Sequence, residues 1–332
     1  MRLAVDAPFH LEATVRVLQR RPSNLIDTWN RQHYRRVIRV REQLVLIDVE
    51  NRGTIDSPDV RLATRPLSND RSIERKETAR VASAILGLGA DAAPAQRLAE
   101  REPALRATAG ALRGMRAPHY PDLFETFANV IPFQQLSLEA GMAVVARLIQ
   151  LFGKRLSDGS HTHFAFPVAG DIADAGIAHL KGCGLSRHKS LALHTAARAI
   201  ASGTLTLTAL EQLPSPQAID RLLELPGIGP WSAALILLRG LGRVDVFPQA
   251  DTGAESSLMK LMHLRSRGAL ARVAARFGEY RGYLYFYGLA SRLLAAGLIG
   301  PASPPAMRQI RISAPTRRAQ TLPCGKRREH EP

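Results

Sequence analysis

The stretch that decides the fold is Leu225-Pro226-Gly227-Ile228-Gly229-Pro230-Trp231-Ser232-Ala233-Ala234. An apolar helical pattern precedes it at residues 219–223, and another follows at residues 233–238. Gly227 and Gly229 permit positive φ and the close approach of another backbone. The sequence therefore predicts two helices joined by a tight glycine turn.

Such a turn offers backbone amides to an anion, because the first residues of the second helix have no intrahelical hydrogen-bond partner. A phosphate placed there meets these N–H groups and the positive end of the helix dipole. Contacts of this kind position a nucleic acid without reading its sequence. We predict phosphate contacts from Gly227, Ile228, Gly229, Pro230 and Ser232. The alternative is an ordinary packing corner between two helices.

A second motif follows the hairpin: Asp245-Val246-Phe247-Pro248-Gln249-Ala250-Asp251-Thr252-Gly253. Asp251 comes twenty residues after Trp231 (251 − 231 = 20). A helical pattern covers residues 252–260, so Asp251 is also a candidate N-cap.

Together these motifs resemble the helix-hairpin-helix glycosylase superfamily and, within it, the DNA-3-methyladenine glycosylase II family. Residues 129–137 and 184–189 are also similar to that family, and the similarity runs from about Leu3 to Leu298. The resemblance implies an α+β N-terminal domain, with a small antiparallel sheet and helices, followed by a mostly α-helical glycosylase domain. It also implies base excision repair of double-stranded DNA that contains damaged bases, alkylated purines above all.

In this resemblance Asp251 is the catalytic carboxylate and Asp245 is a structural residue. Cleavage of an N-glycosidic bond develops positive charge on the sugar, which a carboxylate beneath C1′ stabilises. The reactive atom is hidden in the base stack, so the nucleotide has to be flipped out and the gap filled. Gln135 or Leu136 is the candidate wedge that fills this gap. Arg187 and Lys189 are candidates for contacts to the DNA backbone.

Aromatic side chains are expected to receive the flipped base by stacking and by cation–π attraction. We predict Trp231 first, and then Tyr283 and Tyr287 from a cluster that also contains Tyr280 and Tyr285; a tyrosine-rich helix belonging to the core is the alternative. Three positions depart from the family pattern, with Phe133 in place of a glycine, Ala250 in place of an acidic residue and Leu289 in place of a tryptophan.

Two other functions compete with hydrolytic base release. A non-catalytic protein that binds damaged DNA would use the same hairpin, but the position of Asp251 argues against it. A bifunctional glycosylase/lyase for oxidised bases needs an amine in the hairpin that can form a Schiff base. Trp231 occupies the position of that lysine, which favours a monofunctional enzyme.

The composition agrees with a nucleic-acid partner. The formal net charge is +16, which favours a polyanion. The two cysteines, Cys183 and Cys324, cannot hold an iron–sulfur cluster or a four-cysteine zinc site. His161 and His163 lie in a predicted loop without further ligands, so no metal is expected there. The resemblance implies at most a monovalent cation at the hairpin.

We divide the chain into an N-terminal domain (1–90), a helical glycosylase region (91–300) and a disordered basic tail (301–332). Residues 37–41 and 44–49 predict a β-hairpin, residues 60–63 a further strand and residues 136–152 an amphipathic helix. From about Ile73 to Gly300 the pattern is helical. No membrane span or signal peptide is expected. We expect a monomer in the cytoplasm, associated with the nucleoid through DNA.

Overall fold

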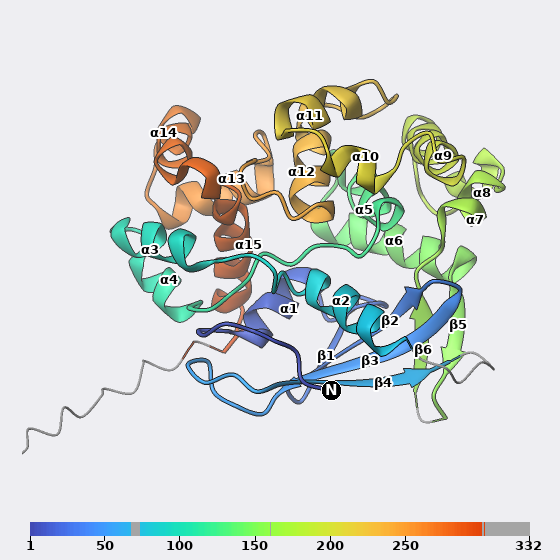
Figure 1. The fold of residues 1–332 in the computed structure, drawn as a ribbon. Helices are drawn as coiled ribbons and strands as arrows, with labels where there is room; N and C mark the ends of the chain where they lie inside the picture. Colours follow the sequence, from blue (N-terminus) through green and yellow to red (C-terminus); the bar gives the residue numbers. More distant parts are fainter. Residues whose placement is uncertain (68–73, 160, 301, 303–332) are drawn as a thin grey trace, which may run out of the picture.

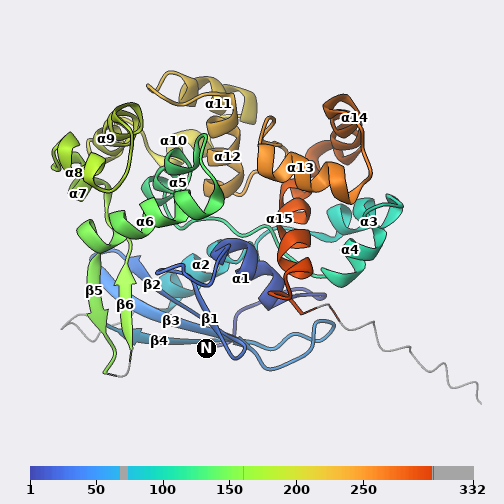
Figure 2. The same cartoon turned by 180° about the vertical axis from the view of Figure 1, so that it is seen from behind.

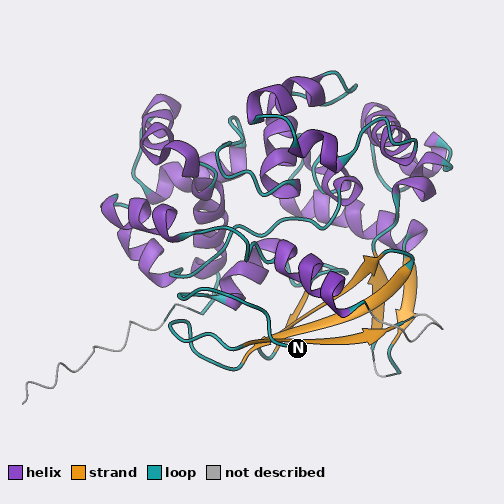
Figure 3. Cartoon of the chain, in the orientation of Figure 1, coloured by secondary structure: helices purple, strands orange, loops and turns teal. Residues whose placement is uncertain are grey.

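The computed structural model describes residues 1–67, 74–159, 161–300 and 302. A sheet forms one end of the molecule, and helices form the rest (Figures 1 and 3). The predicted α+β part followed by a mostly helical part is therefore confirmed. The proposed basic tail, 301–332, lies outside the described residues except for residue 302.

The sheet has four antiparallel strands in the order β1-β2-β3-β4. Its strands are β1 (Thr28–Asn30), β2 (His33–Val40), β3 (Gln43–Asn51) and β4 (Val60–Pro66). A tight turn joins β2 to β3, where Val40 pairs with Gln43. The predicted hairpin and the strand that follows it are confirmed. The β-branched residues in these runs favour strands.

The helices before the hairpin are α1 (Leu11–Gln19), α2 (Arg75–Ile85), α3 (Ala93–Arg101), α4 (Arg106–Ala111), α5 (Leu123–Ala128), the 3₁₀ helix η1 (Ile131–Phe133), α6 (Leu138–Phe152), α7 (Ala169–Ala173), α8 (Ile177–Gly182), α9 (Arg187–Ala201) and α10 (Leu207–Glu211). The rest are α11 (Ser215–Leu223), α12 (Pro230–Gly240), α13 (Thr252–Leu261), α14 (Arg267–Phe277), the 3₁₀ helix η2 (Gly278–Tyr280) and α15 (Tyr283–Ala295). Helix α6 confirms the predicted amphipathic helix, with Met142, Val145, Leu148 and Ile149 buried.

The helical pattern predicted from Ile73 to Gly300 is wrong at one place. Strands β5 (Lys154–Ser157) and β6 (Thr162–Ala165) form a second antiparallel pair between α6 and α7, beside β2 (Figure 2). The pair was missed because its strands are short and half polar. His163 is consequently a strand residue, and its ring is bound to Asp158 (3.0 Å).

Helix α1 contributes to the two largest of the hydrophobic cores. Leu11, Val15 and Leu18 pack in the core that α1 and α2 form with the sheet. Ala13 and Val17 lie on the other face of α1 and pack in the core of the helical part. This sharing places the last turn of α1 between the sheet and the helices. The domain boundary at residue 90 stays a prediction.

A buried ion cluster joins the sheet to α5. The guanidinium of Arg36 on β2 donates to Asp27 (2.9 Å) and to Glu125 of α5, and all three residues are 2% exposed. Burial raises the pKa of Glu125 to about 8; Arg36 opposes this rise, while Asp122 and Asp27 add to it. One proton and one guanidinium therefore balance the charges of this cluster near neutral pH.

Within the described ranges, no helix is long and apolar enough to cross a membrane.

Candidate active site

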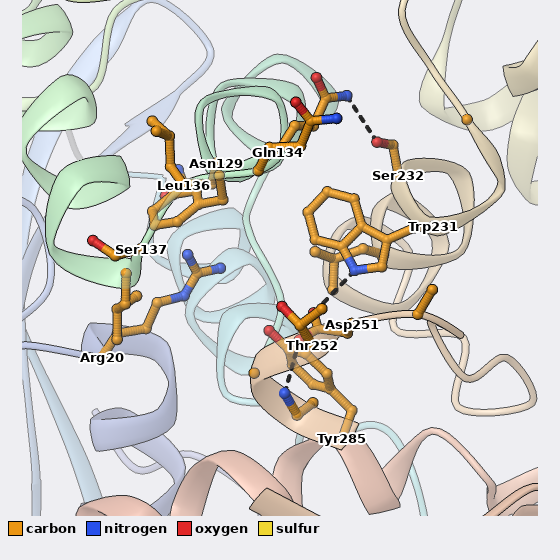
Figure 4. A pocket seen from close by; sticks show the side chains of 18 of the residues that line it. Arg20, Asn129, Gln134, Leu136, Ser137, Trp231, Ser232, Asp251, Thr252 and Tyr285 are labelled. Carbon is orange, nitrogen blue, oxygen red and sulfur yellow. Dashed lines mark hydrogen bonds between the residues drawn. The ribbon is translucent and has the colours of Figure 1, made fainter. Parts of the chain in front are cut away.

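A pocket of about 1200 Å³ opens where the helical hairpin, the turn before α6 and the residue that follows α1 meet. Its walls come from segments far apart in the sequence. They include Arg20 after α1, residues 133–139, Lys189 of α9, residues 229–232 of the hairpin, residues 250–254 and Tyr285, Leu289 and Arg292 of α15. Figure 4 shows Trp231 and Asp251 on one side of the pocket and Arg20 on the other.

The predicted glycine turn joins α11 to α12. Gly227 has a φ of +78°, and a Cβ at this position would lie 2.6 Å from the Cβ of Ala192 on α9. Both the backbone conformation and the packing against α9 therefore require glycine. Gly229 precedes α12 with a φ of −100°, which any residue can adopt, so only Gly227 has the positive φ considered from the sequence.

The hairpin leaves part of its backbone available to an anion. No side chain caps the start of α12, where Pro230 occupies the first turn, and Gly227 and Pro230 are exposed. Two of the predicted phosphate contacts, those of Ile228 and Ser232, are restricted by hydrogen bonds inside the protein. Ile228 is buried and its amide donates to Leu225 O (3.1 Å), and the Ser232 hydroxyl is buried and accepts from Gln134 (2.9 Å). The Ile228 amide is thus already paired, whereas the Ser232 hydroxyl accepts one hydrogen bond and keeps its O–H as a donor.

Asp251 is the N-cap of α13, as predicted from its position before a helical pattern. Its Oδ1 accepts from the amide of Ala254 (2.8 Å), and its Oδ2 accepts from Trp231 Nε1 (3.0 Å). Both oxygens are therefore oriented, and the start of α13 favours a negative charge through the helix dipole. Besides the stacking face that the sequence predicts, Trp231 thus has a second role, because its indole N–H donates to the Asp251 carboxylate.

The backbone before Asp251 is shaped by Glu255. Ala250 has a φ of +63°, and its amide donates to Glu255 Oε1 (2.7 Å). Glu255 is buried, and its other oxygen pairs with Arg267 (2.9 Å). A carboxylate thus supports this turn even though residue 250 itself is not acidic.

The turn between η1 and α6 carries the predicted wedge. Gln135 has a φ of +55° and is exposed, and Leu136 is 42% exposed; both line the pocket. Gln134 ties the turn to the hairpin through its bonds to Gly227 O (2.8 Å) and to Ser232 Oγ. The two candidate wedge residues therefore project from a firmly held backbone.

Lys189 also holds this turn. Its ammonium donates to Pro132 O (3.1 Å) and to Gln134 O, and burial lowers its pKa. Two of its three donors are thus engaged inside the protein, and its predicted contact to DNA is at most a secondary role. Arg187 is exposed at the start of α9, and its contact to DNA stays a prediction.

The assignment of Tyr283 and Tyr287 to the base pocket is wrong. Both side chains are buried away from it, and the Tyr287 hydroxyl donates to Gln96 Oε1 (3.2 Å) on α3. Tyr285 lines the pocket instead, because a residue two positions away in a helix points to a nearly opposite side. Tyr283 and Tyr287 therefore belong to the hydrophobic core, which was the alternative considered for this tyrosine cluster.

Sequence reasoning missed Arg20, Gln134 and Arg292 as pocket residues. Gln134 belongs to the similar stretch before α6, so its neighbourhood was a usable signal. Arg20 and Arg292 lie in different helices far from any motif, and only the fold brings them to the pocket.

The carbonyl oxygens of the hairpin are the groups that would hold the monovalent cation implied by the family resemblance. Leu225 O accepts from Ile228 N and Gly227 O accepts from Gln134, which leaves a second lone pair on each oxygen. These oxygens fit a weakly bound monovalent ion next to the phosphate contacts, and that ion stays a prediction. Among the described residues no group of three or more His, Cys, Asp or Glu side chains could hold a metal.

This fold and this pocket resemble those of helix-hairpin-helix DNA repair proteins. Residues 128–276 match the model of the HhH-GPD superfamily of base excision DNA repair proteins. DNA-3-methyladenine glycosylase 2 of Escherichia coli is 35% identical over 175 residues, which cover 52% of this chain and 60% of the relative. Residues 128–276 are thus similar to the HhH-GPD superfamily, and the relatives that match this chain are AlkA-like glycosylases.

Two further matches define the extent of the likeness. A probable bifunctional transcriptional activator/DNA repair enzyme AlkA of Mycobacterium tuberculosis is 31% identical over 201 residues, 60% of this chain and 39% of the relative. The match thus spans about two fifths of that relative's length. The structure of a 3-methyladenine DNA-glycosylase from Archaeoglobus fulgidus superimposes with a TM-score of 0.75 at 24% identity and covers 89% of this chain and 99% of its own.

Proposed function

We propose that this protein is a monofunctional DNA glycosylase that flips a damaged purine out of duplex DNA and hydrolyses its N-glycosidic bond. The observation that carries the proposal is the Asp251 carboxylate, fixed in the pocket by Trp231 Nε1 and the Ala254 amide. Several relatives are named as DNA-3-methyladenine glycosylases, which supports alkylated purines as substrates.

The chemistry follows from the position of the carboxylate. As the bond between C1′ and the base nitrogen lengthens, the sugar becomes positively charged, and Asp251 stabilises that charge. The bonding electrons leave with the base, and a water molecule adds to C1′ and loses a proton. The hairpin amides would hold the DNA backbone, and Leu136 or Gln135 would fill the gap in the base stack. A monomer bound to DNA, and hence to the nucleoid, is the form we propose.

A covalent lyase route is disfavoured by the amines of the pocket. Indole has no basic amine, so Trp231 cannot form a Schiff base. Lys189 is the single lysine among the lining residues, and its ammonium is bonded to the carbonyls of Pro132 and Gln134. Its lowered pKa makes it the amine to test.

The test combines base release and trapping. The protein is incubated with duplexes that contain methylated, deaminated or oxidised purines, with and without borohydride, and strands are examined before and after alkali. We expect released base and an intact strand that breaks only with alkali. A borohydride-trapped adduct that disappears in Lys189→Ala would establish a lyase. Binding to DNA without any base release would favour the non-catalytic alternative.

A further inference from the structure

Arg20 brings a positive charge from the N-terminal part of the chain to the base pocket. It directly follows α1, where its φ of +62° ends the helix and turns the chain. The residue is only 5% exposed, yet it lines the pocket, opposite Trp231 and Asp251 (Figure 4). A buried arginine in a ligand pocket calls for an account of its charge, because burial of an unpaired charge is costly.

Aromatic side chains, rather than carboxylates, surround this guanidinium. It lies 4.7 Å from the ring centre of Phe133 and 5.9 Å from that of Tyr120, and it donates to the Tyr120 hydroxyl (2.6 Å). No carboxylate in the described part of the chain forms an ion pair with it, and its Nε is buried without a hydrogen-bond partner. A guanidinium has five N–H donors, so most of its capacity is unused.

The electrostatic surroundings keep this group charged. Burial lowers the pKa of Arg20, but Tyr120, Tyr285 and Asp251 raise it, and the result is a pKa above the ordinary value. The pocket therefore has the Arg20 charge on one wall and the Asp251 carboxylate on the other, with Arg292 of α15 as a second guanidinium in its lining.

Building on the proposed function, we propose that Arg20 is a specificity-determining residue that makes the pocket favour neutral damaged purines with hydrogen-bond acceptors on their edge over cationic N-alkylated purines. A cationic base is attracted to Asp251 and the Trp231 face but repelled by Arg20. A neutral base with a carbonyl or ring-nitrogen acceptor takes up the unused guanidinium donors and meets no repulsion.

The same contact assists the departure of a neutral base. When the bond from C1′ to a neutral purine breaks, the electron pair stays on the purine, which leaves as an anion and then takes a proton from water. A guanidinium that donates to this anion stabilises it more than it stabilises the intact base, so the step is accelerated. A cationic purine leaves as a neutral molecule and gains nothing from Arg20. Asp251 thus acts on the sugar and Arg20 on the leaving base.

The experiment compares two lesions in one duplex sequence under single-turnover conditions: hypoxanthine, which is neutral, and 7-methylguanine, which is cationic. In Arg20→Gln we expect hypoxanthine release to fall by about 10- to 100-fold, the scale of one lost hydrogen bond to a charged group. Release of 7-methylguanine should stay constant or rise. Arg20→Lys keeps the charge and should retain part of the preference.

Arg2→Gln is the matched control, because Arg2 is an exposed arginine of the same part of the chain that pairs with Asp59 (3.1 Å), and neither residue lines the pocket. It should leave both rates unchanged. An equal fall for both lesions in Arg20→Gln, with thermal unfolding unchanged, would reduce Arg20 to a structural residue and overturn the inference. If Arg20→Gln does not fold, Arg20→Lys is compared with the wild type. A lower ratio of hypoxanthine release to 7-methylguanine release supports the inference, and an unchanged ratio overturns it.

A binding measurement separates this inference from the proposed function. In Asp251→Asn, flipping of the neutral fluorescent base 1,N6-ethenoadenine is followed by its emission, and binding to the 7-methylguanine duplex is measured in parallel. We expect Arg20→Gln in the Asp251→Asn background to weaken the flipping of 1,N6-ethenoadenine and to leave binding to the 7-methylguanine duplex unchanged. Failure of the wild type to release any base would refute the glycosylase, whereas loss of both binding signals by the same factor would refute the role of Arg20.

Discussion

Arg36 and Arg20 are both buried arginines of the N-terminal part of the chain, but their surroundings are opposite. Arg36 meets two carboxylates, Asp27 and Glu125, where β2 joins α5. Arg20 meets two aromatic rings and one hydroxyl at the edge of an open pocket. The first arrangement satisfies the charge inside the protein, and the second leaves hydrogen-bond donors for a ligand.

The difference shows how a buried charge is assigned to structure or to function. In the Arg36 cluster, removal of one member strands another in a medium of low dielectric constant. At Arg20 no carboxylate is stranded: the aromatic faces remain favourable without the cation, and only the Tyr120 hydroxyl loses a hydrogen bond. Equal burial therefore predicts unequal consequences for stability and for activity.

The largest effect is expected for Arg36→Met. Asp27 would lose its counter-charge in a buried site, which costs about 3–5 kcal/mol of the free energy of unfolding. Urea denaturation measures this loss. Arg20→Met is the control and should change the same free energy by less than about 1 kcal/mol. Equal losses in both variants would remove the distinction between the two sites.

Asp251→Asn should show the opposite pattern, with a large loss of activity and little loss of stability. We expect base release to fall by about 10²–10³-fold, the scale for one preorganised group that stabilises developing charge. The amide oxygen still accepts a hydrogen bond, so α13 keeps its cap and the unfolding midpoint should move little. Near wild-type turnover in a single-turnover assay would disprove the assignment of Asp251.

The Arg36 cluster should also give the folded state a pH dependence. The pKa of Glu125 is raised from 4.5 to about 8 in the folded protein. Its contribution to stability is therefore fully present below pH 4.5 and is lost as the pH rises through about 8. We expect the free energy of unfolding to fall by on the order of 1–2 kcal/mol between pH 6 and pH 9. Glu125→Gln should flatten this slope; an unchanged slope would place the titrating group elsewhere.

The smallest effect is expected for Trp231→Phe. Phenylalanine keeps an aromatic face for the base but cannot donate to Asp251 Oδ2, so the carboxylate loses one of its two fixed contacts. We expect base release to fall about tenfold, the scale of one hydrogen bond to a charged group. Release of hypoxanthine and of 7-methylguanine should fall together, in contrast to Arg20→Gln, and a selective fall would mean that Trp231 acts on the base rather than on Asp251.

The sequence predicted what lies in contiguous motifs. The glycine hairpin and the cap at Asp251 depend on residues a few positions apart, where local conformation and hydrogen bonding decide the structure. The choice between Tyr285 and its neighbours Tyr283 and Tyr287 depends on which face of α15 meets the pocket, and the sequence does not give that orientation. The placement of Arg20 beside Phe133 depends on the packing of α1 between two cores, so only the assembled fold reveals it.

Phe133 illustrates how a departure from a family pattern becomes informative once the fold is known. Read along the sequence, it is a bulky residue where a glycine is usual. In the structure its ring covers the Arg20 guanidinium and fills the space beside Gly141, where a Cβ would come within 2.3 Å of the ring. The departure and the buried charge are thus parts of one arrangement.

Helix α1 has one more consequence, which concerns mechanical coupling. Because its two faces belong to two different cores, the sheet and the helical part cannot rotate against each other without opening one of them. The distance between Arg20 at the end of this helix and Asp251 across the pocket is then set by the rigidity of the protein. Under the proposed function, any adjustment needed to seat a flipped base would fall to the DNA, which would have to bend toward a pocket of fixed width.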